Sequence, residues 1–190
     1  VKNFEVEFKK RRAYDLEPYL PVLTGRIVGS REISNRFLED FRMTIGDMAA
    51  EYNYGELCRL AHSEGIAMHS ESAGPHLPPV DGLKTLGIND IPMGESWARA
   101  TTHRNTEGKR LHVKLGASAA HIYDRKLVAS ESLTGWQHWQ HGPSDYKQLT
   151  DIALCEGLNQ IMFHTFAHNP KVAGKPGFTY HAGEHLNVNT

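Results

Sequence analysis

Apolar residues at helical spacing dominate the first third of the chain. Between residues 34 and 64 they recur at i, i+4, i+8, i+11 and i+15, as Phe37, Phe41, Ile45, Met48 and Tyr52. The same stripe continues through Leu57, Leu60 and Ala61, and Gly65 stands where helices commonly end. We therefore predict one long amphipathic helix from Ser34 to Glu64.

Residues 3–13, ahead of the long helix, predict the end of another helix. Pro18 and Pro21 then divide the following segment into a turn and an extended stretch.

Short apolar runs, each typical of a buried strand, alternate with helical patterns in the rest of the chain. The runs are GIAMHSES ending near Glu71, NDIPMGE, RKLVASES ending at Glu131, and LNQIMFHTFAH. Pro92 weakens the second of them. The intervening helices are predicted over residues 81–86, over 106–123 with Thr106 as cap, and over 144–156 with Ser144 as cap and Gly157 at the end.

This alternation predicts a parallel sheet with right-handed crossovers, and thus an α/β protein. Two architectures remain open, namely half of a (β/α)8 TIM barrel and a small doubly wound sheet. The chain has no GxGxxG motif and no P-loop, so the doubly wound, nucleotide-binding alternative lacks its usual fingerprint.

Charge and composition narrow the function further. A net charge of -1 over 190 residues does not suit a general binder of nucleic acid or of an anionic membrane. Likewise, no apolar run approaches the length of a membrane span. Cys58 and Cys155 lack metal-ligand spacing, and we expect two buried free thiols. The chain begins at Val1 without Met and ends at Thr190 within a segment, which suggests a fragment.

Ionisable side chains stand at the ends of all four predicted strands. They are His69 with Glu71, then Glu95, then Glu131, and finally His164 with His168. One strand-end carboxylate commonly caps a helix or pairs with an arginine, but four on one edge favour a site. If the strands are parallel neighbours, these side chains converge on the rim where such folds build their sites.

A rim of carboxylates, histidines and aromatic rings suits a sugar, whose hydroxyl groups need polar partners. Aromatic residues follow the strand ends, at Trp97, Trp136, Trp139 and Phe166. Glycoside hydrolysis generally needs two carboxyl groups, and the three glutamates supply them. Calcium, which prefers oxygen ligands, is a second reading for Glu71, Asp90 and Glu95. A zinc pair of His164 and His168 is the weakest of these hypotheses, because four-residue spacing on a strand only places both side chains on the same face.

Four segments resemble glycoside hydrolase family 106, the α-L-rhamnosidases and their relatives. They are YDLEPYLPVLTGRIVGS, DIPMGESWA, ASAAHIYDRKLVASESLTG and CEGLNQIMFHTFAHNP, in the family's order and spread over almost the whole chain. The resemblance implies the C-terminal half of a catalytic (β/α)8 barrel, about strands 5–8, within a larger multidomain protein. It also implies hydrolysis with inversion by two glutamates, and a calcium ion that contacts the sugar.

The resemblance implies roles for single residues. LVASES resembles the strand that delivers one catalytic glutamate, so Glu131 is expected to be the general base. The general acid would precede Val1, and the calcium ligand maps onto Glu95. Contacts with the sugar are expected from a group at the strand ends: Glu71, His69, Trp97, His164 and His168. The loop HSESAGPHLPPVDGL departs from the AEPYGG-like loop of rhamnosidases, so the resemblance does not fix which sugar is preferred.

We therefore expect residues 1–190 to form a partial barrel domain, truncated at both ends, whose partners are a carbohydrate and the remaining domains of the full-length chain. The resemblance makes a periplasmic or secreted location plausible for that protein. Two alternatives remain: a catalytically inactive carbohydrate-binding relative, or a retaining glycosidase of another barrel family with Glu131 as nucleophile.

Overall fold

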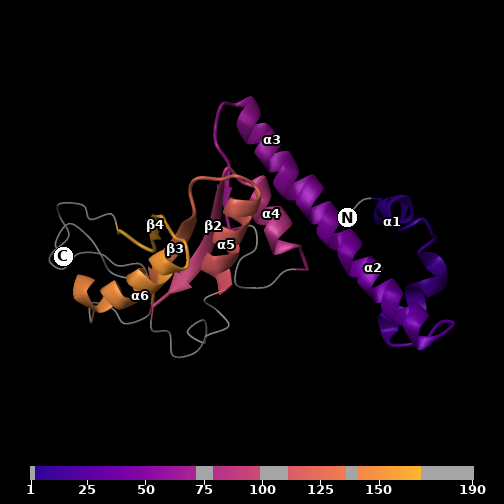
Figure 1. The fold of residues 1–190 in the computed structure, drawn as a ribbon. Helices are drawn as coiled ribbons and strands as arrows, with labels where there is room; N and C mark the ends of the chain where they lie inside the picture. The colour runs from indigo at the N-terminus through magenta and orange to yellow at the C-terminus, as the bar shows by residue number, and fades with distance from the viewer. Residues whose placement is uncertain (1–2, 72–78, 99–110, 136–140, 168–190) are drawn as a thin grey trace.

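A computed structural model describes residues 3–71, 79–98, 111–135 and 141–167 (Figure 1). The N-terminal part is helical and contains α1 (Phe4–Arg12), the 3₁₀ helix η1 (Glu17–Thr24), α2 (Arg31–Ala49), the π-helical segment η2 (Ala50–Gly55) and α3 (Glu56–Ser63). Strands then alternate with helices as β1 (His69–Ser70), α4 (Gly82–Ile88), β2 (Ile91–Trp97), α5 (Leu111–Ile122), β3 (Ala129–Thr134), α6 (Pro143–Cys155) and β4 (Gln160–Phe163).

The four strands form one parallel sheet in the order β1-β2-β3-β4, which confirms the predicted alternation. Helix α4 contacts both β2 and α5, so these two helices cover the same face of the sheet. Val128 packs against Ala117 and Ala120 of α5, while Ile161 of β4 joins a cluster with Val113 and Ala153. The strand order contains no reversal, whereas a doubly wound sheet reverses at its switch point.

The N-terminal helices have an aromatic core of their own. Its fully buried members are Phe8 and Phe37, and the Tyr14 ring meets Phe8 edge to face with 5.0 Å between centroids. Ion pairs join this part to the sheet, because the Asp47 carboxylate lies 2.7 Å from Arg12 of α1 and 3.0 Å from Lys84 of α4. Burial alone would raise the pKa of Asp47, but these two cations hold it below its usual value.

The predicted long helix differs from the observed one at its start and in its second half. It begins at Arg31, capped by the Ser30 hydroxyl, which accepts a hydrogen bond from the Ile33 N–H. The π-helical segment η2 then interrupts it. Because a π turn takes more residues than an α turn, later side chains leave the predicted face, and Leu57 and Leu60 are exposed.

Several other boundaries also differ. The stretch with Pro18 and Pro21 is a 3₁₀ helix, not a turn and an extended segment. Helix α6 starts at Pro143, and its N-cap is Gly142 instead of the predicted Ser144. The Gly142 N–H donates a hydrogen bond to the Asp145 carboxylate. The predicted cap Thr106 lies outside the described residues.

The strands and one thiol also correct the sequence-based expectations. Strand β1 has only two residues and is half-buried, and β4 ends at Phe163. Pro92 lies inside β2 but precedes its first pair with β3, Met93 with Ala129, so it breaks no bond of that ladder. Both cysteines are free, and Cys58 is buried, but Cys155 is exposed on α6, where its helical face points to solvent.

Replacing Gly157 by Ala should destabilise the domain by roughly 1–3 kcal/mol. Gly157 closes α6 at a φ of +109°, and an added Cβ would lie 2.7 Å from the Cβ of Ala117. Thermal unfolding of the intact polypeptide would measure the loss. The matched control is Gly116→Ala in α5, where the new methyl makes ordinary contacts of 3.6 Å or more. Equal stability of the two variants would contradict this packing.

Candidate active site

Three glutamates from adjacent parts of the sheet meet on one face. Glu95 of β2 and Glu131 of β3 are paired in register, and Glu71 directly follows β1. Carboxylate oxygens of all three lie within 4.8 Å of one another. The structure thus brings together Glu71, Glu95 and Glu131, as the sequence predicts. Glu71 directly follows β1, but Glu95 and Glu131 lie inside their strands and not at the predicted strand ends, because β2 and β3 run on to Trp97 and Thr134.

This face is the one turned away from the helices. Val128 packs against α5, and successive side chains of an extended chain point to opposite faces. Glu131, an odd number of residues further on, therefore points to the open face, and Glu95 shares that face through the register. In a closed barrel this is the inner face.

Two polar side chains hold Glu131. The Thr134 hydroxyl donates a hydrogen bond of 2.5 Å to Glu131 Oε1, and His164 Nδ1 lies 3.0 Å from the same oxygen. The Thr134 hydroxyl and His164 Nδ1 are themselves 3.0 Å apart. A carboxylate with these partners keeps one oxygen in a fixed place.

A bulge at the end of β3 explains how Thr134 reaches Glu131. Residues three apart on a regular strand point to opposite faces. Here the register shifts so that Trp97 pairs with Thr134, and Leu133 adopts a positive φ of 66°. The extra residue turns Thr134 back to the face of Glu131. Sequence reasoning missed Thr134, because no local motif in LVASESLTG signals the bulge.

Glu95 is the most buried of the three glutamates, with 7% of its surface exposed. The indole N–H of Trp97, two residues on, donates a hydrogen bond to Glu95 Oε1. The predicted sugar-contacting Trp97 therefore uses its N–H to hold Glu95, and its contact with a sugar stays a prediction.

Three carboxylates this close repel one another when all are ionised, so the cluster favours a bound cation. Its donor set consists of carboxylate oxygens, which are the ligands that calcium prefers. The residues present therefore fit calcium by the chemistry of their donors.

The other predicted site residues have mixed outcomes. His69 lies on the same face as Glu71, two residues earlier, and its buried Nε2 has no hydrogen-bond partner within the described parts of the chain. His168, Trp136 and Trp139 lie outside the described residues. Phe166 is exposed.

Asp90 does not join the glutamates, contrary to the calcium set suggested by the sequence. It directly precedes β2 and is bonded to His62 at the end of the sheet where the strands begin. The reason is topological, since the start and the finish of a parallel strand lie at opposite ends of the sheet.

A parallel α/β sheet that gathers glutamates, a histidine and a tryptophan on its open face is typical of enzymes that hydrolyse glycosides. The family model described as alpha-L-rhamnosidase, Glyco_hydro_106, matches residues 1–190. The chain belongs to glycoside hydrolase family 106, as its sequence motifs suggest.

Two relatives illustrate the similarity. A Formosa agariphila protein named "Putative beta-glucuronidase" is 35% identical over 189 residues, which are 99% of this chain and 16% of that protein. The solved structure of a rhamnosidase from Novosphingobium sp. PP1Y aligns with a TM-score of 0.87 and 32% identity, over 100% of this chain and 18% of that one. The chain thus spans less than a fifth of either relative. None of the described helices is long and apolar enough to cross a membrane.

Proposed function

We propose that residues 1–190 form strands 5–8 of the catalytic (β/α)8 barrel of a longer α-L-rhamnosidase-like glycoside hydrolase. The observation that carries this proposal is the cluster of Glu71, Glu95 and Glu131 on the face of the parallel sheet opposite α4 and α5. A barrel places its strands in sequential order with all helices outside, which agrees with the strand order and with α4 and α5 on one face.

Exposed apolar side chains support a larger assembly. Phe163 and Phe166, at and just after the edge strand β4, are more than half exposed, and Leu57 and Leu60 project from α3 at the other side of the sheet. An edge strand with apolar neighbours normally pairs with another strand or is covered. The remaining strands and helices of a barrel would cover both sides.

Glu131 acts in this proposal as the general base. Its carboxylate takes the proton of a water molecule that attacks the anomeric carbon, while a carboxylic acid from another part of the full-length protein protonates the leaving oxygen. Thr134 and His164 fix one oxygen of Glu131 and so direct the other toward the water. The proposal assigns contact with the sugar to the predicted residues that the structure describes, which are Glu71, His69, Trp97 and His164.

Glu95, together with Glu71, would hold a calcium ion. When bound, calcium supplies positive charge that neutralises these carboxylates and attracts sugar hydroxyl oxygens. Trp97 keeps the Glu95 carboxylate in place through its indole N–H.

A β-glucuronide is the second candidate substrate, because the Formosa agariphila relative carries the name of a β-glucuronidase. The anionic sugar of a glucuronide would need a cationic partner near the three carboxylates. The need for a cationic partner therefore distinguishes a β-glucuronide from an α-L-rhamnoside, which is uncharged.

The intact polypeptide, meaning the proposed longer protein that contains residues 1–190, should hydrolyse an aryl α-L-rhamnoside. Residues 1–190 alone should not, because the proposed general acid lies outside them. Release of the aryl group, measured beside the corresponding aryl β-D-glucuronide, decides the sugar. Turnover by residues 1–190 alone would contradict the proposal that the general acid lies outside them. Sugar binding without turnover by the intact polypeptide would instead identify an inactive carbohydrate-binding relative.

A further inference from the structure

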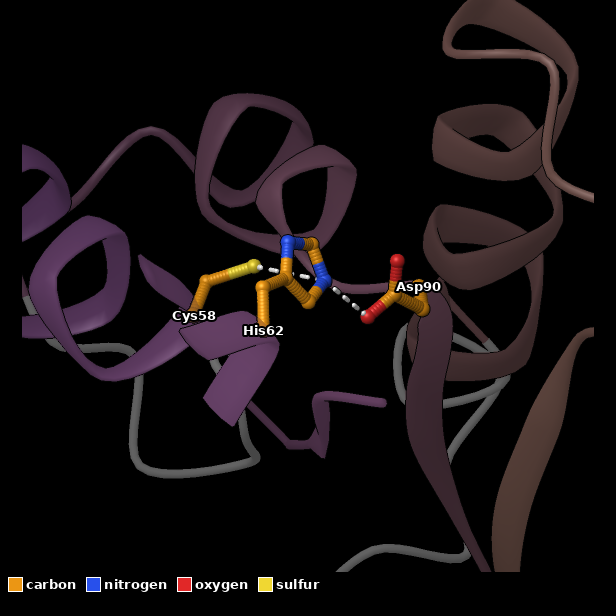
Figure 2. A group of neighbouring side chains, drawn as sticks. All are labelled: Cys58, His62 and Asp90. Carbon is orange, nitrogen blue, oxygen red and sulfur yellow. Dashed lines mark hydrogen bonds and ion pairs between the residues drawn. The ribbon is translucent and has the colours of Figure 1, made fainter. Parts of the chain in front are cut away.

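A second cluster of potential metal ligands lies at the end of the sheet where the strands begin. Cys58 and His62 stand four residues apart on the same face of α3, and Asp90 directly precedes β2 (Figure 2). His62 Nε2 lies 3.6 Å from Cys58 Sγ and 2.7 Å from Asp90 Oδ2. Sulfur, imidazole nitrogen and carboxylate oxygen all lie within 4.8 Å of one another.

Cys58 and Asp90 approach the same nitrogen of His62, as Figure 2 shows. This excludes a catalytic Cys–His–Asp triad, in which the thiol and the carboxylate use different ring nitrogens. It instead brings three potential metal ligands together around one point.

We propose that Cys58, His62 and Asp90 bind a zinc ion. Thiolate and imidazole ligands select zinc over calcium or magnesium. In a tetrahedral zinc site the bond lengths put sulfur and nitrogen about 3.6 Å apart, and nitrogen and oxygen about 3.4 Å apart. The sulfur–nitrogen distance is already present, whereas the contact between His62 and Asp90 has to widen.

The surroundings hold the three ligands in place. The Asp90 carboxylate also accepts a hydrogen bond of 2.7 Å from the Met68 N–H. The Cys58 thiol donates a hydrogen bond of 3.4 Å to the Ile88 carbonyl until zinc displaces its proton. Arg125 is the opposing cation, with its guanidinium 4.0 Å from Asp90 Oδ1. Zinc with one thiolate and one carboxylate is electrically neutral, so Arg125 opposes binding only weakly.

The protonation of the ligands is consistent with zinc binding. Burial and the charge of Asp90 raise the pKa of the Cys58 thiol, so the thiol keeps its proton without a metal. Burial would raise the pKa of Asp90, but hydrogen bonds from His62 and Met68 lower it. Zinc displaces the thiol proton to solvent, and the neutral His62 ring carries its proton on Nδ1 while Nε2 binds the metal.

This site is separate from the glutamate cluster. Asp90 precedes Glu95 by five residues of β2, which corresponds to roughly 16 Å along an extended strand. A bound zinc would join the end of α3 to the segments that lead into β1 and β2, and so would stabilise the fold. His62 is half exposed, which leaves a fourth position for water.

Zinc titration of the intact polypeptide, reduced and freed of metal, tests the proposal against a chromophoric chelator with excess calcium present. We expect one zinc per chain to be lost, or its affinity lowered at least about 100-fold, in Cys58→Ser and in His62→Gln. Cys155→Ser, which removes the exposed thiol elsewhere, is the matched control and should bind as the wild type does. Cobalt in place of zinc should give a thiolate charge-transfer band that Cys58→Ser lacks.

The proposal fails if the wild type binds zinc no better than His62→Gln, or if the cobalt band persists in Cys58→Ser. Because His62 is half exposed, His62→Gln keeps the test informative even when Cys58→Ser does not fold. Glycosidase activity does not enter this test, so its outcome is independent of the proposed function.

Discussion

Replacing Glu131 by Gln should lower the kcat of the intact polypeptide toward its aryl glycoside by about 10²–10⁴-fold, the usual effect of losing a general base. Glutamine has nearly the same shape as glutamate and can still accept the hydrogen bond from the Thr134 hydroxyl. It cannot take a proton from water. The loss should therefore appear in kcat, with KM changed much less.

The matched control for this substitution is Glu39→Gln, which removes an exposed carboxylate of α2 and should leave kcat unchanged. Nuclear magnetic resonance of the first-formed sugar anomer distinguishes the role of Glu131. An inverted product agrees with a general base, whereas a retained product and a covalent adduct on Glu131 would identify a nucleophile. Wild-type activity in Glu131→Gln would contradict both roles.

The sequence predicted the parallel sheet because each strand is a short apolar run between helices of clear amphipathic period. It also predicted that Glu71, Glu95 and Glu131 meet, since it placed them at the same end of adjacent parallel strands, and the register does pair Glu95 with Glu131. This inference needed only the strand order and not the exact strand ends. It therefore held although β2 and β3 extend beyond the predicted boundaries.

Features that depend on distant contacts were not predictable in the same way. The bulge at Leu133 turns Thr134 toward Glu131, and its cause lies in the pairing of β3 with β2 and in the packing of Leu133 against Tyr146. The π-helical segment within the long helix likewise leaves no local signal in an otherwise regular apolar stripe. Both change which face a side chain occupies, so periodicity assigned Leu57 and Leu60 to the wrong surface.

The same topological argument explains the error at Asp90. Sequence proximity to Glu95 suggested a shared calcium site, but the residues stand before and within one strand and thus at different edges of the sheet. Asp90 instead meets Cys58 and His62 of α3, about thirty residues earlier in the chain. Contacts of such range arise from the fold and not from a motif.

Removing calcium from the intact polypeptide with a chelator should lower its activity at least about 100-fold, because a bound metal typically supplies several kcal/mol of charge stabilisation. Glu95→Gln should give a similar loss that added calcium only partly restores. Glu95 is 93% buried and receives the Trp97 N–H, so its carboxylate is held where a neutral amide cannot replace its charge. Calorimetric titration with calcium measures the binding directly, without reference to activity.

Glu39→Gln again serves as the control and should bind calcium as tightly as the wild type does. Unchanged activity and stability after chelation, with no heat of calcium binding in the titration, would contradict a calcium ion at the point where Glu71, Glu95 and Glu131 meet.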